Sequence, residues 1–209
     1  MSLKERAIEF FLAEQVLKFG DFTLKSGRKS PYFFNTGSLC SATQLATMGE
    51  LYAEKLREIS AFDDADVIFG SAYKGIPIAV STAIAMGNDR PGIRSVSDRK
   101  EAKTHGDASA FLGVIKSGDR VVIVDDVITD GATKIEALEK LKGAGCIPLG
   151  FIIAFDRAEP GKDGSGTAKE SFEKQTGLPV YPLVDVNDIA KVKPDFRDVL
   201  AGYMASFAA

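Results

Sequence analysis

VVIVDDVITDGATK, residues Val121 to Lys134, carries the strongest structural signal in the chain. Four consecutive apolar residues run into two adjacent acids, Asp125 and Asp126, and a turn containing Gly131 then opens a segment with helical periodicity. An apolar run without polar alternation is typical of a strand that is covered on both faces. The segment therefore predicts a buried parallel strand that ends in two carboxylates and leads through a tight loop into a helix.

Similar apolar runs surround this segment and alternate with helical patterns. We expect further strands at 66–70, 92–98, 147–157 and 178–185, and helices at 75–87 and 131–145. Strands that alternate with helices at this spacing predict a mostly parallel central sheet flanked by helices. Such an open α/β fold binds its ligands at the carboxyl ends of the strands, near the point where the strand order reverses.

The residues outside this alternation give weaker signals. The pattern predicts a helix over 3–20 that stops at Gly20, a hairpin over 21–35, and a helix over 43–59 capped by Ser41 or Thr43. The polar segment 158–177 predicts no element. At 209 residues, we expect one domain that spans 1–209.

Composition narrows the class of protein. The net charge of −3 argues against a nucleic-acid-binding protein, which is usually basic. Cys40 and Cys146 have no metal-ligand spacing, so we expect free thiols in a reducing compartment. The chain shows neither a signal-peptide core near its start nor an apolar run approaching about 18 residues, so we expect a cytoplasmic protein with no membrane partner.

The loop after the two acids has the features of an anion site. Gly131 permits backbone geometry that other residues avoid, and a helix starting near Ala132 would present N–H groups and a positive dipole end. Thr129 and Thr133 add hydroxyl donors. The acids would repel a phosphate in this loop, so they must address hydroxyls or a cation on the same ligand, which points to ribose 5-phosphate. The alternative is that Asp125 and Asp126 only end the strand and cap the helix.

A basic, polar segment over 99–119 separates two of the predicted strands. Arg99, Lys100, Lys103 and His105 fall within seven positions, and His105 is the only histidine in the chain. Long loops inside compact domains are often lids, so we expect a long mobile loop. The alternative is an ordinary solvated loop without a role in binding.

Taken together, these segments resemble one family. The run from Val121 to Thr133 resembles the ribose-phosphate signature of the type I phosphoribosyltransferases. Four further segments are similar to the orotate phosphoribosyltransferases among them: FTLKSGRKSPYFFN (Phe22–Asn35), FGSAYKGIP (Phe69–Pro77), RKEAKTHG (Arg99–Gly106) and FDR (Phe155–Arg157). The resemblance implies the type I phosphoribosyltransferase fold, with a core of about 41–185 and a small hood formed mainly by 1–40 and the C-terminal region.

The resemblance also implies an activity and a set of site residues. The expected enzyme is a glycosyltransferase of pyrimidine biosynthesis that moves ribose 5-phosphate from phosphoribosyl pyrophosphate to orotate. The residues expected in catalysis are Lys103, His105, Asp125 and Asp126. Those expected to bind phosphoribosyl pyrophosphate are Lys25, Tyr73, Lys74, Arg99, Lys100, Lys103, His105, Asp125, Asp126, Val127, Ile128, Thr129, Asp130, Gly131, Ala132 and Thr133. Those expected to bind orotate are Phe33, Phe34, Thr129 and Arg157, with the guanidinium of Arg157 pairing with the orotate carboxylate.

Further expectations concern the metal, the partner and one departure from the family. The resemblance implies Mg²⁺ held mainly by substrate and water, without direct protein ligands, and a homodimer that shares loop residues 99–105 across subunits. Asp130 stands where the family usually has a small neutral residue or threonine, and we expect its side chain to face solvent. Two alternatives stay open: a phosphoribosyltransferase for another base, or a non-catalytic sensor of phosphoribosyl pyrophosphate.

Overall fold

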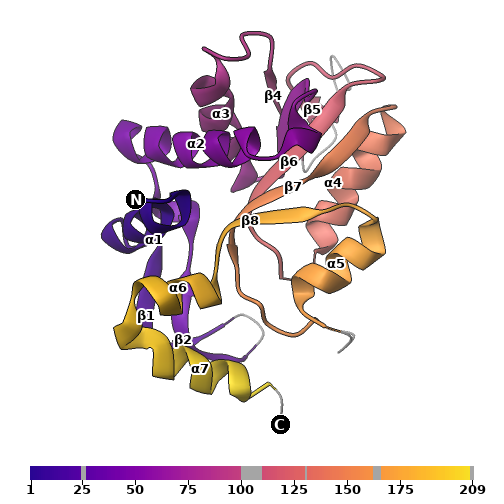
Figure 1. Cartoon of the computed structure of the whole chain (residues 1–209). Coiled ribbons are helices and arrows are strands. Elements are labelled where there is room, and N and C mark those ends of the chain that lie inside the picture. Colours follow the sequence, from indigo (N-terminus) through magenta and orange to yellow (C-terminus); the bar gives the residue numbers. More distant parts are fainter. Residues whose placement is uncertain (25–26, 100–109, 130, 162–165, 208–209) are drawn as a thin grey trace.

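The structure is a computed structural model that describes residues 1–24, 27–99, 110–129, 131–161 and 166–207 (Figure 1). A six-stranded sheet forms its centre, in the order β5-β4-β3-β6-β7-β8. All neighbouring strands are parallel except β4 and β5, which confirms the predicted α/β fold with a mostly parallel sheet. The strands are β3 (Val67–Gly70), β4 (Arg94–Asp98), β5 (Phe111–Leu112), β6 (Arg120–Val127), β7 (Ile147–Asp156) and β8 (Val180–Asp185).

Helices cover both faces of this sheet because the central strands are apolar on both sides. On one face, Val122 and Val124 of β6 belong to the core beneath α1 (Leu3–Ala13), α2 (Ala42–Arg57) and α3 (Gly75–Met86). On the other face, Val121 and Ile123 pack with residues of α4 (Ala132–Gly143) and α5 (Ala168–Thr176). Successive residues of β6 therefore point to opposite faces, and this alternation continues to the two acids at its end.

A second, smaller sheet lies beside the main one. The strands β1 (Leu17–Thr23) and β2 (Lys29–Phe34) pair in antiparallel fashion, as the predicted hairpin requires. Figure 1 shows this pair together with α1, α6 (Val186–Val192) and α7 (Arg197–Ala205) below the main sheet. Short 3-10 helices at η1 (Thr36–Ser38), η2 (Ser60–Phe62) and η3 (Pro194–Phe196) complete the described elements.

The predicted helix over 3–20 is wrong beyond Ala13. Helix α1 ends there, Gln15 adopts a positive φ of 55°, and the chain turns into β1 at Leu17. The apolar residues of this segment suited a helix, but pairing of Leu17 with Phe34 of β2 and stacking of Phe19 on Phe196 fix it as a strand. Gly20 lies inside that strand, where the register shifts, instead of ending a helix.

Helices α5 and α2 can also be compared with the elements predicted from the sequence. The segment 158–177, for which no element was expected, contains α5, whose start is a capping box between Thr167 and Glu170. This helix buries only Phe172, so its apolar signal was weak. For α2 the expected cap is confirmed, since Ser41 forms a capping box with Gln44.

The strand order reverses between β3 and β6. From β3 the chain proceeds to β4 and β5 on one side, whereas β6, β7 and β8 follow on the other side. Open α/β sheets bind ligands at such a switch point, outside the carboxyl ends of the strands. In the part of the chain that the structure describes, no helix is long and apolar enough to cross a bilayer.

Candidate active site

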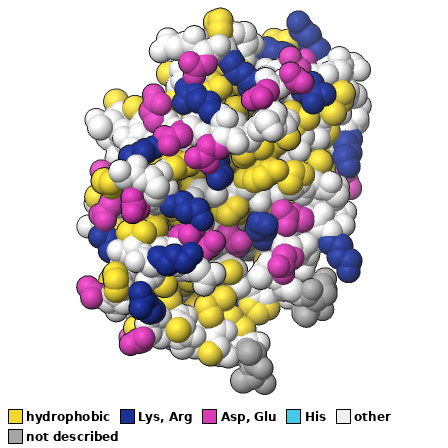
Figure 2. All heavy atoms as spheres, viewed as in Figure 1, with side chains coloured by type: hydrophobic (Ala, Val, Ile, Leu, Met, Phe, Trp, Pro, Cys, Tyr) yellow, Lys and Arg dark blue, Asp and Glu magenta, His cyan; other side chains and the backbone are white. Residues whose placement is uncertain are grey.

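The carboxyl edge of the main sheet carries the described residues that the sequence pointed to. Figure 2 shows charged side chains of both signs across the middle of the molecule, between the main sheet and the elements drawn below it. The residues lie in or after four strands: Tyr73 and Lys74 after β3, Arg99 after β4, Asp125, Asp126 and residues 127–129 and 131–133 at β6, and Arg157 after β7.

The two acids are buried, and each is paired with a different lysine. Asp125 and Asp126 are 6% and 5% exposed. Asp125 Oδ2 lies 2.7 Å from the Nζ atom of Lys134 in α4, and Asp126 Oδ2 lies 2.7 Å from the Nζ atom of Lys74 at the start of α3. Because adjacent residues of a strand point to opposite faces, each acid meets a cation from the helix that covers its own face.

The remaining carboxylate oxygens accept backbone hydrogen bonds. The N–H of Asp126 donates to Asp125 Oδ1 at 2.9 Å, and the N–H of Val127 donates to Asp126 Oδ1 at 2.8 Å. Neither acid caps α4, because Gly131 occupies the cap position and no side chain bonds there. The interpretation of both acids as simple capping residues is therefore wrong.

Burial and neighbouring charges act on Asp125 in opposite directions. Burial raises the pKa of Asp125, the Lys134 ammonium lowers it, and the Asp126 carboxylate raises it, with a net increase. Tyr52 of α2 is fully buried, and its hydroxyl donates to the main-chain oxygen of Asp125 at 2.7 Å. The pKa of Tyr52 lies well above its ordinary value because of burial and the charges of Asp126 and Asp125, so this phenol stays a donor.

The loop after β6 combines a fixed backbone with an exposed rim. Gly131 has a φ of +70°, and a Cβ atom added to it would lie 2.5 Å from Cδ2 of Phe172. Only glycine satisfies both the positive φ and the close ring. Thr129, Ala132 and Thr133 are exposed at the start of α4, where N–H groups and the helix dipole favour an anion.

The segment between β3 and α3 brings a second cation to the acids. Tyr73 is exposed, and the Ala72–Tyr73 peptide bond is cis. The N–H of Ala72 donates to Asp98 Oδ1 at 2.8 Å, while Asp98 Oδ2 lies 3.0 Å from Lys140 Nζ. Lys74 is half-exposed and also borders a small, mostly apolar hollow between η1, α2 and α3. An outward-facing lysine beside a buried acid can exchange that acid for a ligand anion.

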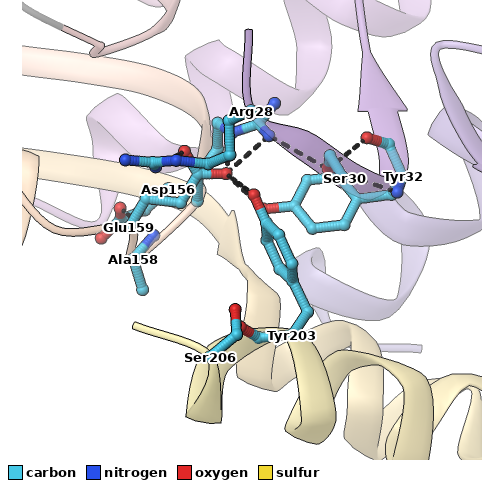
Figure 3. A network of polar contacts seen from close by, with 9 residues as sticks. Arg28, Ser30, Tyr32, Asp156, Ala158, Glu159, Tyr203 and Ser206 are labelled. Atoms are coloured by element: carbon cyan, nitrogen blue, oxygen red, sulfur yellow. Dashed lines mark hydrogen bonds and ion pairs between the residues drawn. The ribbon is translucent and has the colours of Figure 1, made fainter. Parts of the chain in front are cut away.

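Arg157 contacts Glu159, which belongs to a polar network that the sequence did not reveal. Figure 3 shows Arg28, Tyr32, Glu159 and Tyr203 of this network. The side chain of Arg157 is buried, with Nε and Nη2 at 2.7 and 2.6 Å from Oε1 of Glu159. The hydroxyl of Tyr203, reaching from α7, donates to the same oxygen at 2.8 Å, and Arg28 Nη1 lies 2.8 Å from Oε2. The Arg157 guanidinium also lies 4.7 Å above the ring of Tyr32. Two guanidinium groups, those of Arg157 and Arg28, therefore contact the carboxylate of Glu159.

The two phenylalanines of β2 point to opposite sides. Phe34 is buried in the core, where it stacks on Phe155 with ring centroids 5.0 Å apart. Phe33 is 38% exposed and stacks on Phe22. Of the two rings, only that of Phe33 is open to a ligand.

Several expected site residues are not among those that the structure describes. These are Lys25, Lys100, Lys103, His105 and Asp130. Arg99 is described, and it ties the end of β4 to β5 through its N–H to the Ala110 oxygen at 2.9 Å and its Nε to the Phe111 oxygen at 3.2 Å.

The structure brings further residues to the site that were not expected from the sequence. Lys134 was overlooked although it occupies the first of the positions 134, 137, 138 and 141, the buried face of α4. A lysine on an otherwise apolar helical stripe was a usable signal. Glu159 and Tyr203 had no comparable signal, because α7 approaches Glu159 only in the folded chain.

The chain is similar to known proteins over most of its length. A family model described as the phosphoribosyl transferase domain matches residues 42–184. The orotate phosphoribosyltransferase of Bifidobacterium adolescentis is 43% identical over 195 residues, which cover 90% of this chain and 84% of the relative. That of Methylococcus capsulatus is 45% identical over 178 residues, covering 85% of this chain and 82% of the relative. The crystal structure of the Francisella tularensis orotate phosphoribosyltransferase superposes with a TM-score of 0.83 at 33% identity and covers 95% of this chain and 97% of its own.

Proposed function

The chain belongs to the phosphoribosyl transferase domain family and, within it, to the orotate phosphoribosyltransferases, and we propose that it transfers ribose 5-phosphate from phosphoribosyl pyrophosphate to N1 of orotate. The products are orotidine 5′-phosphate and pyrophosphate, in the biosynthesis of pyrimidine nucleotides. One observation carries the proposal at the level of the site: two buried acids, each held by a lysine, stand beside an exposed glycine loop at the switch point of the sheet.

The acids suit the charge that develops during the transfer. The bond between C1 of the ribose and the pyrophosphate oxygen breaks, and a bond from C1 to N1 of orotate forms. Positive charge gathers on the ribose ring between these events, and fixed carboxylates stabilise such charge without reorganising. Asp125 and Asp126 therefore engage the ribose hydroxyls and face the developing cation, while the loop 127–133 holds the 5-phosphate.

The cations around the acids suit the leaving group. Lys74 is half-exposed and moves from Asp126 to the pyrophosphate when the substrate binds. Tyr73 and Arg99 lie at the neighbouring strand ends and reach the same group. Lys25, Lys100, Lys103 and His105, which lie outside the described residues, contribute further positive charge, with Lys103 and His105 assisting departure of the pyrophosphate.

The network of Arg157 suits the base. Orotate is flat and anionic, and the guanidinium groups of Arg157 and Arg28 beside Glu159 suit its carboxylate. The exposed ring of Phe33 covers one face of the base, and Thr129 and the backbone beside Phe34 line its edge. Burial of Arg157 excludes water from this contact, which strengthens the pairing with a carboxylate.

The donor set fits a magnesium ion carried by the substrate. Both oxygens of Asp125 and both oxygens of Asp126 already accept hydrogen bonds or ion pairs from the chain. Mg²⁺ commonly keeps several waters and binds through substrate phosphates, where it neutralises charge on the pyrophosphate. Asp125 and Asp126 would hold the ribose hydroxyls, and the ion would supply positive charge to the pyrophosphate. The substrates carry several charges and do not cross a bilayer unaided, which supports a reaction in the cytoplasm.

The outer side of α3 supports a homodimer. This helix, GIPIAVSTAIAM, contains no charged residue, and a helix that is apolar all round is normally covered. Val80 and Ile84 are exposed one turn apart, Ile84 by 74%. Helix α3 begins directly after Lys74, so a subunit docked here lies near the active site. The resemblance to the family implies that loop residues 99–105 are shared across such a dimer.

A comparison of bases tests the proposed function. The protein is mixed with phosphoribosyl pyrophosphate, Mg²⁺ and either orotate, uracil, adenine or hypoxanthine, and loss of each base is followed by its ultraviolet absorbance. The expected result is loss of orotate alone, dependent on Mg²⁺. Turnover of another base would assign a different phosphoribosyltransferase, whereas binding of phosphoribosyl pyrophosphate without turnover of any base would indicate a sensor.

A further inference from the structure

We propose that Lys134 is a positioning residue for the transfer reaction: it fixes the Asp125 carboxylate and supplies the counter-charge that allows two acids to stand side by side. The proposal rests on the proposed function, because it concerns the acid that faces the ribose. Lys134 does not need to touch the substrate, since it acts through Asp125.

The stability of the fold does not by itself explain a lysine at position 134. Lys134 is 6% exposed and lies in the first turn of α4, where the helix dipole opposes a positive charge. The other buried residues of this helix are the apolar Ala137, Leu138 and Leu141. A buried ion pair often contributes no more stability than apolar residues of similar volume. An aliphatic residue would therefore serve the core at least as well.

The geometry assigns the lysine to one carboxylate. Its Nζ atom lies 2.7 Å from Asp125 Oδ2, and the two side chains are only 8% and 9% exposed. The other oxygen of Asp125 accepts the N–H of Asp126 at 2.9 Å. Both oxygens are thus fixed from within the chain, which determines the rotation of the carboxylate.

The two lysines at the acids differ in what they can do. Lys74 pairs with Asp126 from an exposed segment, with 45% of its side chain open to solvent. Lys134 is enclosed, so it stays with Asp125 whether or not a ligand is bound. Lys74 can exchange its partner for a substrate anion, whereas Lys134 serves as a permanent counter-ion.

The charges around Asp125 give the expected effect of removing Lys134. The titratable groups that face Asp125 are Lys134 from α4, Asp126 beside it on β6, and Tyr52 from α2, whose pKa is raised and which stays neutral. Lys74 from α3 balances Asp126. Without Lys134, burial and Asp126 both favour the protonated form of Asp125, so its pKa rises further. Activity that needs the ionised acid is then lost at the acidic end of the pH range.

The test compares Lys134→Met with Lys134→Arg in the full chain. Methionine keeps the length of the side chain and removes its charge, whereas arginine keeps the charge. Lys142→Met is the matched control, because Lys142 lies on the same helix and is exposed. The measurement is the dependence of kcat/KM for orotate transfer on pH for each variant.

For Lys134→Met we expect the acidic limb of the profile to move to higher pH. Each unit of this shift lowers activity below the new pKa about tenfold, and activity recovers in alkaline buffer. Lys134→Arg retains the wild-type limb, and so does Lys142→Met. A purely structural lysine would lower the unfolding temperature without moving the limb, and that result would overturn the proposal.

A stability measurement tests the pair without any substrate. In Lys134→Met the pKa of Asp125 in the folded state lies above that in the unfolded state, so the folded state holds the proton more tightly. The loss of unfolding temperature relative to wild type is then smallest at acidic pH, where Asp125 is protonated in both folded proteins, and grows as pH rises through the raised pKa. A loss independent of pH would contradict the inference. If the wild-type protein did not transfer ribose 5-phosphate to orotate, the proposed function would be wrong. The dependence of the unfolding temperature on pH would still test the ion pair between Lys134 and Asp125.

Discussion

Lys74, Lys134 and Arg157 each face a carboxylate of their own chain. Lys74 meets Asp126, Lys134 meets Asp125, and Arg157 meets Glu159. Internal carboxylates thus hold three cations in position before any ligand arrives. Pre-organised groups stabilise a transition state without having to move during the reaction.

At the residue scale, Arg157→Met should weaken recognition of orotate. Loss of a buried charge partner costs about 2 kcal/mol or more, which corresponds to roughly a thirtyfold rise in the KM for orotate. Glu159 keeps Arg28 and Tyr203 as partners, so the fold should persist. Steady-state kinetics with each substrate varied in turn give the measurement. Arg57→Met on the surface of α2 is the control, and an unchanged KM for orotate in Arg157→Met would remove this residue from the base site.

Glu159→Gln tests whether Glu159 holds Arg157 in place for binding orotate. The amide keeps the size of the side chain but removes the charge that fixes Arg157, so we expect a higher KM for orotate and a smaller change in the KM for phosphoribosyl pyrophosphate. Tyr203→Phe removes one hydrogen bond to Glu159 and should act in the same direction by a smaller factor. Equal effects of Glu159→Gln on both KM values would argue for a general loss of structure instead.

At the scale of elements, the junction of β6 and α4 depends on Gly131. Its φ of +70° and the nearby ring of Phe172 both exclude a side chain. Gly131→Ala should destabilise the fold by about 1–3 kcal/mol and also displace the loop that we propose to hold the phosphate. Thermal unfolding and the KM for phosphoribosyl pyrophosphate measure the two effects. Gly143→Ala in the last turn of α4, where an added Cβ meets nothing within 4 Å, is the control. Wild-type stability in Gly131→Ala would contradict this account of the loop.

Some of the helices, strands and site residues could be predicted from the sequence alone, and others could not. The apolar strands and the helices between them followed from periodicity, because strands covered on both faces leave a strong pattern. The structure of segment 14–20 did not follow from periodicity, because its apolar residues fit a helix and a strand equally well. Only pairing with β2 decides between the two. The acids and the glycine loop were predictable from 121–134. Glu159 and Tyr203, which belong to the network around Arg157, were not predictable from the sequence. Tyr203 of α7 meets Glu159 only through tertiary packing.

At the scale of the whole molecule, the apolar outer side of α3 predicts an assembly. Val80→Glu combined with Ile84→Glu should convert the proposed dimer into monomers. Activity should fall as well if each site uses residues 99–105 of its neighbour, as we propose. Sedimentation velocity and the transfer assay give the two measurements. Val199→Glu on α7, whose valine is also half-exposed, is the control. A wild-type protein that sediments as a fully active monomer would contradict the shared-loop model.

The central claim is that this chain joins ribose 5-phosphate to orotate, and the products test it most directly. Wild-type protein is incubated with phosphoribosyl pyrophosphate, orotate and Mg²⁺, and orotidine 5′-phosphate and pyrophosphate are quantified by mass spectrometry and a pyrophosphate assay. The account predicts equal amounts of both products, with neither formed when orotate is omitted. Pyrophosphate released without orotidine 5′-phosphate, or no product from a folded protein that binds phosphoribosyl pyrophosphate, would contradict it.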